Sequence, residues 1–202
     1  MINVIMLATK NYDKIKEIIK IIPSGIKIKT FNDFEYIPDV IEDGKTIEEN
    51  SQKKAIEIAR FTSLVSIADD TGLFVEYLNF RPGVYSSRYA GENATYEDNC
   101  RKLLKEMEKF KGKERKAFFR CAATIAFPDG RFITKVGEIE GIITLKQMGN
   151  NGFGYDPIFY VPSYRMTFAQ MPLDLKNTIS HRAKAFKMLE EIIKKVVSYG
   201  NF

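Results

Sequence analysis

The chain opens with an apolar run followed at once by an amphipathic stripe, and this order limits the folds open to it. The run covers residues 2–8 and is nearly continuous, which predicts a buried strand of a parallel sheet. A helix is predicted next, because apolar residues recur at the spacing of one helical face: Ile15, Ile18, Ile19 and Ile22. Residues 9–14 therefore form a strand-to-helix turn.

This turn is a candidate phosphate site. Backbone amides at a helix N-terminus attract anions, and Lys10 and Lys14 add positive charge. The alternative is ordinary helix capping by Thr9 or Asn11, with both lysines in solvent. The turn lacks the glycines and the Gly-Lys-Thr ending of a P-loop, so it does not match that motif.

Two adjacent carboxylates, Asp69 and Asp70, follow a second apolar run at residues 64–68. The run predicts a short buried strand. If the strand stays extended, one carboxylate points into a cleft and the other points away, because neighbouring residues face opposite sides. A magnesium-phosphate enzyme needs such a pair, with one carboxylate on the metal or the water and a second to tune it. The alternative is that the pair opens a turn, after which residues 73–78 form a separate strand.

An acidic loop at residues 39–44 and a helix start behind it offer further carboxylates. Glu42, Asp43 and Glu49 are possible metal ligands. More often such residues solvate a loop or cap a helix, and Glu49 in particular is explained by the capping-box pattern of Thr46 to Glu49.

The second half of the chain predicts antiparallel strands. Residues 117–127 and 132–139 flank a Pro-Asp-Gly turn and are typical of a β-hairpin. Residues 148–157 then place three glycines and two aromatic residues in one loop. Glycine lets a backbone approach a ligand closely, and an aromatic ring can stack on a base. The alternative is a turn anchored by two aromatic side chains.

A last helix is predicted over residues 182–197, and several donors precede it or begin it. Lys176, His181 and Arg182 lie within seven positions and could bind an anion or a carbonyl. The alternative for the single histidine is a residue of the helix cap.

Size, charge and cysteine usage set broad limits. The 202 residues suit one domain or two closely fused lobes, and 45% hydrophobic residues allow a sizeable core. No apolar run reaches the roughly 20 residues that span a bilayer, and the N-terminus lacks the features of a signal peptide. Two cysteines without metal-ligand spacing favour a reduced, cytoplasmic protein. A net charge of +5 and a pI of about 9.0 suit a nucleotide or nucleic acid partner, or simply a solvated basic surface.

Six motifs, taken in order, resemble those of one family, the inosine/xanthosine triphosphate pyrophosphatases, house-cleaning hydrolases of non-standard purine nucleotides. They cover nearly the whole chain: residues 7–14 (LATKNYDK), 46–50 (TIEEN), 68–73 (ADDTGL), 82–89 (PGVYSSRY), 152–157 (GFGYDP) and 179–182 (ISHR). Each motif is short, but six in family order are hard to obtain by chance.

The resemblance implies a single α/β domain over residues 1–202, with a long twisted mixed sheet flanked by helices and two lobes with a cleft between them. It also implies a homodimer, dependence on Mg²⁺, and cleavage of a purine nucleoside triphosphate (ITP, dITP or XTP) to the monophosphate and pyrophosphate. Neither a nucleic acid nor a membrane partner is expected.

Carried over residue by residue, the family motifs imply roles for particular positions. Asp70 would be the metal-linked general base. A second metal-binding glutamate falls at Ile41 or Glu42, which makes Glu42 the candidate ligand. Residues implied to bind substrate are Thr9, Lys10, Asn11, Tyr12, Asp13, Lys14, Thr71, Phe153, Gly154, Tyr155, Asp156, Lys176, His181 and Arg182. The family often has serine where Thr71 stands, and the hydroxyl is kept.

Two other functions remain open from the residues. One is a related nucleotide pyrophosphatase that acts on other modified or ordinary nucleotides. The other is a basic nucleic-acid-binding module, although the chain lacks zinc-finger spacing and an RNA-recognition aromatic signature. Hypoxanthine and xanthine carry a 6-oxo acceptor where adenine carries a 6-amino donor, so a donor such as Arg182 suits the first two bases.

Overall fold

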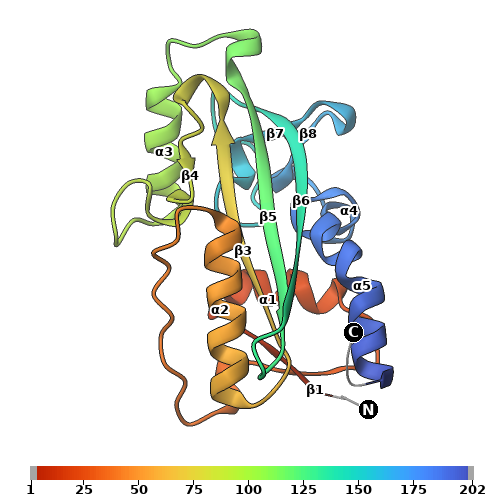
Figure 1. Ribbon diagram of the computed structural model, residues 1–202. Coiled ribbons are helices and arrows are strands. Elements are labelled where there is room, and N and C mark those ends of the chain that lie inside the picture. Colours follow the sequence, from red (N-terminus) through yellow and green to blue (C-terminus); the bar gives the residue numbers. More distant parts are fainter. Residues whose placement is uncertain (1–3, 200–202) are drawn as a thin grey trace. The chain divides into compact units, whose positions relative to one another are not determined.

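The computed structural model describes residues 4–199, which form an α/β protein (Figure 1). Within that range are five α-helices and a mixed eight-stranded sheet of order β2-β1-β3-β5-β6-β7-β8, with β4 paired to β3. The strands are β1 (Val4–Leu7), β2 (Lys27–Lys29), β3 (Ser66–Val75), β4 (Pro82–Gly83), β5 (Lys116–Ala126), β6 (Phe132–Ile143), β7 (Phe159–Val161) and β8 (Met166–Thr167). The helices are α1 (Tyr12–Ile21), α2 (Ile47–Thr62), α3 (Tyr96–Glu106), α4 (Leu173–Ile179) and α5 (His181–Tyr199).

The chain divides into two compact units. The described part of unit 1 is residues 4–70, 121–137 and 182–199, and unit 2 is residues 71–120 and 138–181. Over residues 4–199 we find no helix that is both long and apolar enough to cross a bilayer.

In unit 1, helices cover both faces of the sheet. Side chains alternate along a strand. Ile5 and Ile67 therefore pack in one cluster with α1 and α5, whereas Met6 and Ala68 pack in another with α2. β1 pairs in parallel with β2 and β3, so the predicted buried parallel strand is confirmed, apart from Ile2 and Asn3, which lie outside the described residues.

Strand β3 differs from its prediction. Strands were predicted at residues 64–68 and 73–78, with either an extended chain or a turn at the two aspartates, and β3 runs without interruption from Ser66 to Val75. The turn interpretation is therefore wrong. Gly72 is explained by close packing instead of by a turn. A Cβ atom there would lie 2.6 Å from the carbonyl oxygen of Gly83 on the neighbouring strand β4. The two carboxylates therefore lie within an extended strand.

The N-terminal capping predicted for the helices of unit 1 is partly confirmed. The Asn11 side chain caps α1 by accepting from the amides of Asp13 (3.0 Å) and Lys14 (3.1 Å). The Thr46 hydroxyl caps α2 by accepting from the Glu49 amide. The Glu49 carboxylate, however, accepts from the Lys45 amide, so the predicted reciprocal capping box is only half formed.

Unit 2 has its own apolar core, which joins α3 to parts of β3, β5, β6 and β7. The predicted hairpin is confirmed as β5 and β6, which are adjacent in the sheet and extend across both units. A short helix, α4, was not predicted ahead of α5; it begins directly after Pro172, which serves as its N-cap.

Candidate active site

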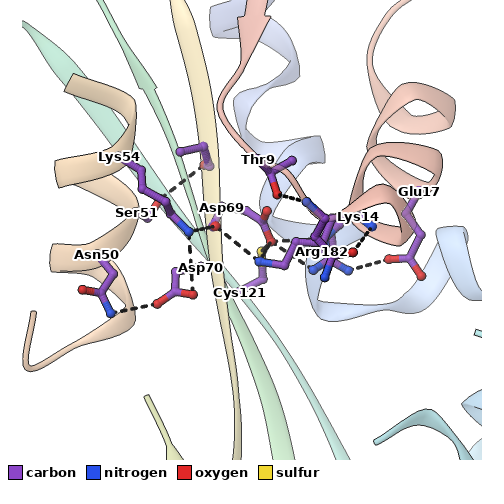
Figure 2. Close-up of polar contacts among 12 residues, drawn as sticks. Thr9, Lys14, Glu17, Asn50, Ser51, Lys54, Asp69, Asp70, Cys121 and Arg182 are labelled. Atoms are coloured by element: carbon purple, nitrogen blue, oxygen red, sulfur yellow. Dashed lines mark hydrogen bonds and ion pairs between the residues drawn. The ribbon is translucent and has the colours of Figure 1, made fainter. Parts of the chain in front are cut away.

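The extended course of β3 places its two carboxylates on opposite faces of the sheet (Figure 2). Asp69 follows the face of Ile67, toward α1 and α5, and Asp70 follows the face of Ala68, toward α2. Both side chains belong to unit 1, and each meets different partners.

Asp69 is fully buried among cations. Its Oδ2 accepts from Arg182 Nη2 at 3.0 Å and Nε at 3.3 Å, and lies 3.2 Å from Lys14 Nζ. Burial alone would raise the pKa of Asp69, but the charges of Lys14, Arg182 and Lys54 outweigh it and hold that pKa well below its usual range. Asp69 is therefore a permanent anion.

Arg182 connects Asp69 to a second buried carboxylate. The Arg182 side chain is 1% exposed, and its Nη1 donates to Glu17 Oε2 of α1 at 2.5 Å. Burial would lower the pKa of the guanidinium, yet Asp69 and Glu17 raise it. The base of α5 is thus tied to α1 and β3 by buried ion pairs.

The burial of the Asp70 carboxylate is offset by weaker contacts than the burial of Asp69. Its Oδ2 accepts from Asn50 Nδ2 at 3.1 Å, and its nearest cation is Lys54 Nζ, 4.0 Å from Oδ1. Lys54 also donates to the Asp69 carbonyl oxygen at 2.8 Å and pairs with Glu42 at 2.9 Å. Burial raises the pKa of Asp70; Lys54 and Lys14 oppose the rise, and the Glu42 carboxylate adds to it. Asp70 therefore has a higher proton affinity than its neighbour.

Asp70 and Glu42 are the candidate carboxylates for a metal ion. They share the Lys54 ammonium group, which lies within 4.0 Å of both. Among residues 4–199, no group of three or more His, Cys, Asp and Glu side chains is arranged to hold a metal. Mg²⁺ commonly uses only one or two carboxylates and takes its remaining ligands from water and substrate phosphates, so a pair of carboxylates could hold it.

The predicted strand-to-helix turn lies at the start of α1, and the helix capping that was its alternative interpretation is also present. The Asn11 side chain already engages the amides of Asp13 and Lys14. Thr9 Oγ1 accepts from the Asn11 amide, and Lys10 pairs with Asp39 at the surface. Tyr12 is mostly exposed. Within this turn, Lys14 contacts the buried anion Asp69, with Nζ 3.2 Å from Oδ2.

The glycine-rich loop lies in unit 2 and is held by a buried ion pair. Asp156 Oδ2 pairs with Lys176 Nζ of α4 and accepts from the Phe153 amide at 2.9 Å. Gly152 has φ +71°, and a Cβ atom there would come within 2.0 Å of Asp156 Oδ2, so only glycine fits. The Lys176 ammonium also lies 5.0 Å from the centre of the Phe153 ring.

Two predicted nucleoside contacts are buried in the same unit. The Tyr155 hydroxyl donates to the Ser86 carbonyl oxygen at 2.9 Å, and burial raises the pKa of that phenol. The His181 ring stacks on Phe119, with ring centres 4.6 Å apart. Thr71 is half-buried on β3. Lys176, His181, Thr71 and residues 153–156 therefore belong to unit 2, whereas Arg182 belongs to unit 1.

Sequence reasoning missed three members of the charged cluster: Glu17, Asn50 and Lys54. Asn50 and Lys54 lie on the buried face of α2 together with Ile47, Ala55 and Ile58, and a polar residue at such a position must find a partner, which is a signal in the sequence. Glu17 is buried on α1 away from its apolar stripe, and the sequence gives no comparable signal for it.

Comparison with known proteins assigns the chain to a family. The Ham1 family model matches residues 5–192. The chain belongs to the Ham1 family. It is 44% identical over 201 residues to a dITP/XTP pyrophosphatase of Desulfotalea psychrophila, covering 98% of this chain and 89% of that protein. It is also 44% identical to a dITP/XTP pyrophosphatase of Geobacter sulfurreducens, covering 93% and 94% of the two chains.

A solved structure gives the same assignment. The HAM1 protein from Coxiella burnetii superimposes with a TM-score of 0.87 at 38% identity, covering 96% of this chain and all of that one. The family resemblance inferred from the six motifs is thus confirmed.

Proposed function

We propose that this Ham1-family chain hydrolyses dITP, XTP and ITP to the nucleoside monophosphate and pyrophosphate, and so removes non-standard purine nucleotides from the cellular pool. Full-length relatives at 44% identity support the reaction. The structural observation that carries it is Asp70, a buried carboxylate with a raised pKa that shares a lysine with Glu42.

In this proposal Asp70 is the general base. It takes a proton from water as the water oxygen bonds to the α-phosphorus, and the bond from that phosphorus to the bridging oxygen breaks to release pyrophosphate. A carboxylate whose pKa is raised toward neutrality is a better base than a solvated one. Asp69 is the weaker base of the two, since Lys14 and Arg182 lower its pKa and occupy its Oδ2.

Asp70 and Glu42 would hold Mg²⁺, which supplies charge neutralisation at the phosphates when bound. Lys54 lies within 4.0 Å of both carboxylates and is itself a candidate phosphate contact. The raised pKa of Lys54, produced by Asp70 and Glu42 against the effect of burial, keeps its ammonium charged.

The remaining contacts follow the family motifs. The turn from Thr9 to Lys14 would hold the triphosphate, chiefly through Lys14 and Lys10. Thr71, residues 153–156, Lys176 and His181 would contact the nucleoside. For Arg182 the buried ion pairs favour support of Asp69 over direct reading of the base, because its side chain is 1% exposed.

A single assay tests this function. Pyrophosphate release is measured from inosine, xanthosine, guanosine and adenosine triphosphates, with Mg²⁺ and with excess chelator. We expect turnover of the inosine and xanthosine nucleotides far above that of the adenosine nucleotide, and none with chelator. Equal turnover of all four would instead favour a general nucleotide pyrophosphatase, and no release at all would contradict the proposal.

The homodimer, the division into two lobes with a cleft and the cytoplasmic location remain predictions. Size-exclusion chromatography with light scattering tests the first of them directly.

A further inference from the structure

Helix α3 touches the glycine-rich loop at two places. The Tyr96 ring lies 5.8 Å from the Phe153 ring, centre to centre, at an angle of 45°. One helical turn later, Cys100 Sγ donates to the Gly154 carbonyl oxygen at 3.3 Å. Residues four apart lie on the same face of a helix, so this face of α3 follows the loop.

The loop backbone has other supports that do not depend on Tyr96. Asp156 holds the Phe153 amide, and Lys176 holds Asp156. The Lys176 ammonium also lies 5.0 Å from the Phe153 ring centre. These contacts fix the course of the loop backbone. The Phe153 ring can still rotate about its side-chain torsions, so neighbouring side chains determine its orientation.

Core packing does not explain Tyr96. Its side chain is 42% exposed, and it stands at the first position of α3, where a capping box between Thr95 and Asp98 fixes the backbone. A half-exposed aromatic ring beside Phe153, on a helix start whose backbone is capped, is suited to restrict that ring, because tilted aromatic pairs are favourable beyond the area they bury.

We propose that Tyr96 is a positioning residue for the nucleoside: it holds the Phe153 ring in the orientation on which a purine base stacks. The proposal rests on the assignment of Phe153 to the nucleoside site in the proposed function. It assigns Tyr96 no part in the chemical step, so its effect falls on binding and spares turnover.

The test uses Tyr96→Ala and Tyr96→Phe, with Tyr77→Ala as the matched control. Tyr77 is 53% exposed in the same unit, and its ring pairs with Phe110 at 6.1 Å between ring centres. Calorimetric titration with inosine monophosphate should show a roughly three- to tenfold weaker Kd for Tyr96→Ala. Tyr96→Phe and Tyr77→Ala should match the wild type. For inosine triphosphate, KM should rise by the same factor, with kcat changed by less than about twofold.

A double-mutant cycle separates positioning from general stability. In a Phe153→Ala background, Tyr96→Ala should have no further effect on Kd, because the ring it orients is gone. An undiminished effect in that background would overturn the proposal, as would an unchanged Kd for Tyr96→Ala or a wild type that does not bind the monophosphate. A wild type that binds the monophosphate but releases no pyrophosphate would contradict the proposed function alone.

Discussion

Asp69 and Asp70 are joined by one peptide bond, yet they lie in opposite electrostatic environments. On the α1 and α5 side of β3, Asp69 contacts Lys14 and Arg182 directly, and its pKa is lowered. On the α2 side, the Asp70 carboxylate accepts from the Asn50 amide at 3.1 Å and lies 4.0 Å from Lys54, a lysine that it shares with Glu42, and its pKa is raised by burial.

The difference shows how a strand can divide two roles between adjacent residues. Alternation along the strand sends each carboxylate to a different helix, and the cations on that helix decide its ionisation. Asp69, which contacts two cations through Oδ2, stabilises the structure, and in the proposed function Asp70, buried with less compensation, carries the chemistry. The predictions below test this division.

Asp70→Asn should have the largest effect on activity. Losing a general base that also binds the metal should reduce kcat by about 10³-fold or more. Because burial raises the pKa of Asp70, its ionised form opposes folding above that pKa, so the variant should melt at or above the wild-type temperature at neutral pH. Pyrophosphate release and calorimetry measure both quantities. Near-normal turnover in the folded variant would refute the assignment.

Asp69→Asn should have the largest effect on stability. It leaves Arg182 and Lys14 buried without their shared anion, which should cost about 3–5 kcal/mol. For a chain of this size that lowers Tm by roughly 6–20 °C. Since the pKa of Asp69 is lowered, its stabilisation is present above the unfolded-state pKa of about 3.9 and is lost as pH falls toward the folded-state value. A variant as stable as the wild type would contradict the stabilising role assigned to Asp69.

Arg182→Ala should resemble Asp69→Asn. It leaves both Asp69 and Glu17 without their guanidinium partner, so Tm should fall. The kcat/KM values for inosine and adenosine triphosphates should fall together, with their ratio changed by less than about twofold. If Arg182 instead donates to the 6-oxo group, the ratio should change on the order of 10- to 100-fold, which would give Arg182 a direct part in base selection.

Glu42→Gln should have the smallest effect, confined to the metal. Removal of one carboxylate from the pair with Asp70 should raise the half-saturating Mg²⁺ concentration on the order of tenfold, with kcat recovering at high Mg²⁺. Asp43→Asn is the matched control, because this exposed neighbour pairs with Lys53 instead. An equal shift in both variants would point to general loss of negative charge in the loop.

Much of unit 1 could be predicted from sequence. The apolar run that ends at Ala8 and the apolar stripe of α1 are local patterns, and the adjacent Asp69 and Asp70 stand out after a second apolar run. The order of the six family motifs then implied roles for these residues. The course of β3 was missed, because Asp and Gly favour turns locally. Packing of β4 on Gly72, and the Leu73 amide bonded to the Ser86 hydroxyl at 2.9 Å, keep the strand extended.

The ion pairs could not be predicted, because they are set by tertiary structure. Glu17 and Arg182 are 165 residues apart in the chain, and no local pattern relates them. Sequence identified Arg182 as a donor toward the base, and only the folded chain shows that its guanidinium is occupied by Asp69 and Glu17. Lys54 was overlooked for a similar reason, since its partners are in a loop and on a strand.

A titration of the two carboxylates by NMR tests the central claim most directly. The protein is labelled with ¹³C at aspartate side chains, and the two signals are assigned from the spectra of Asp69→Asn and Asp70→Asn. We predict that Asp70 titrates above the ordinary aspartate value of about 3.9, and that Asp69 stays ionised to the lowest pH at which the protein remains folded. The reverse order, or two titrations near the ordinary value, would contradict the division of roles between them.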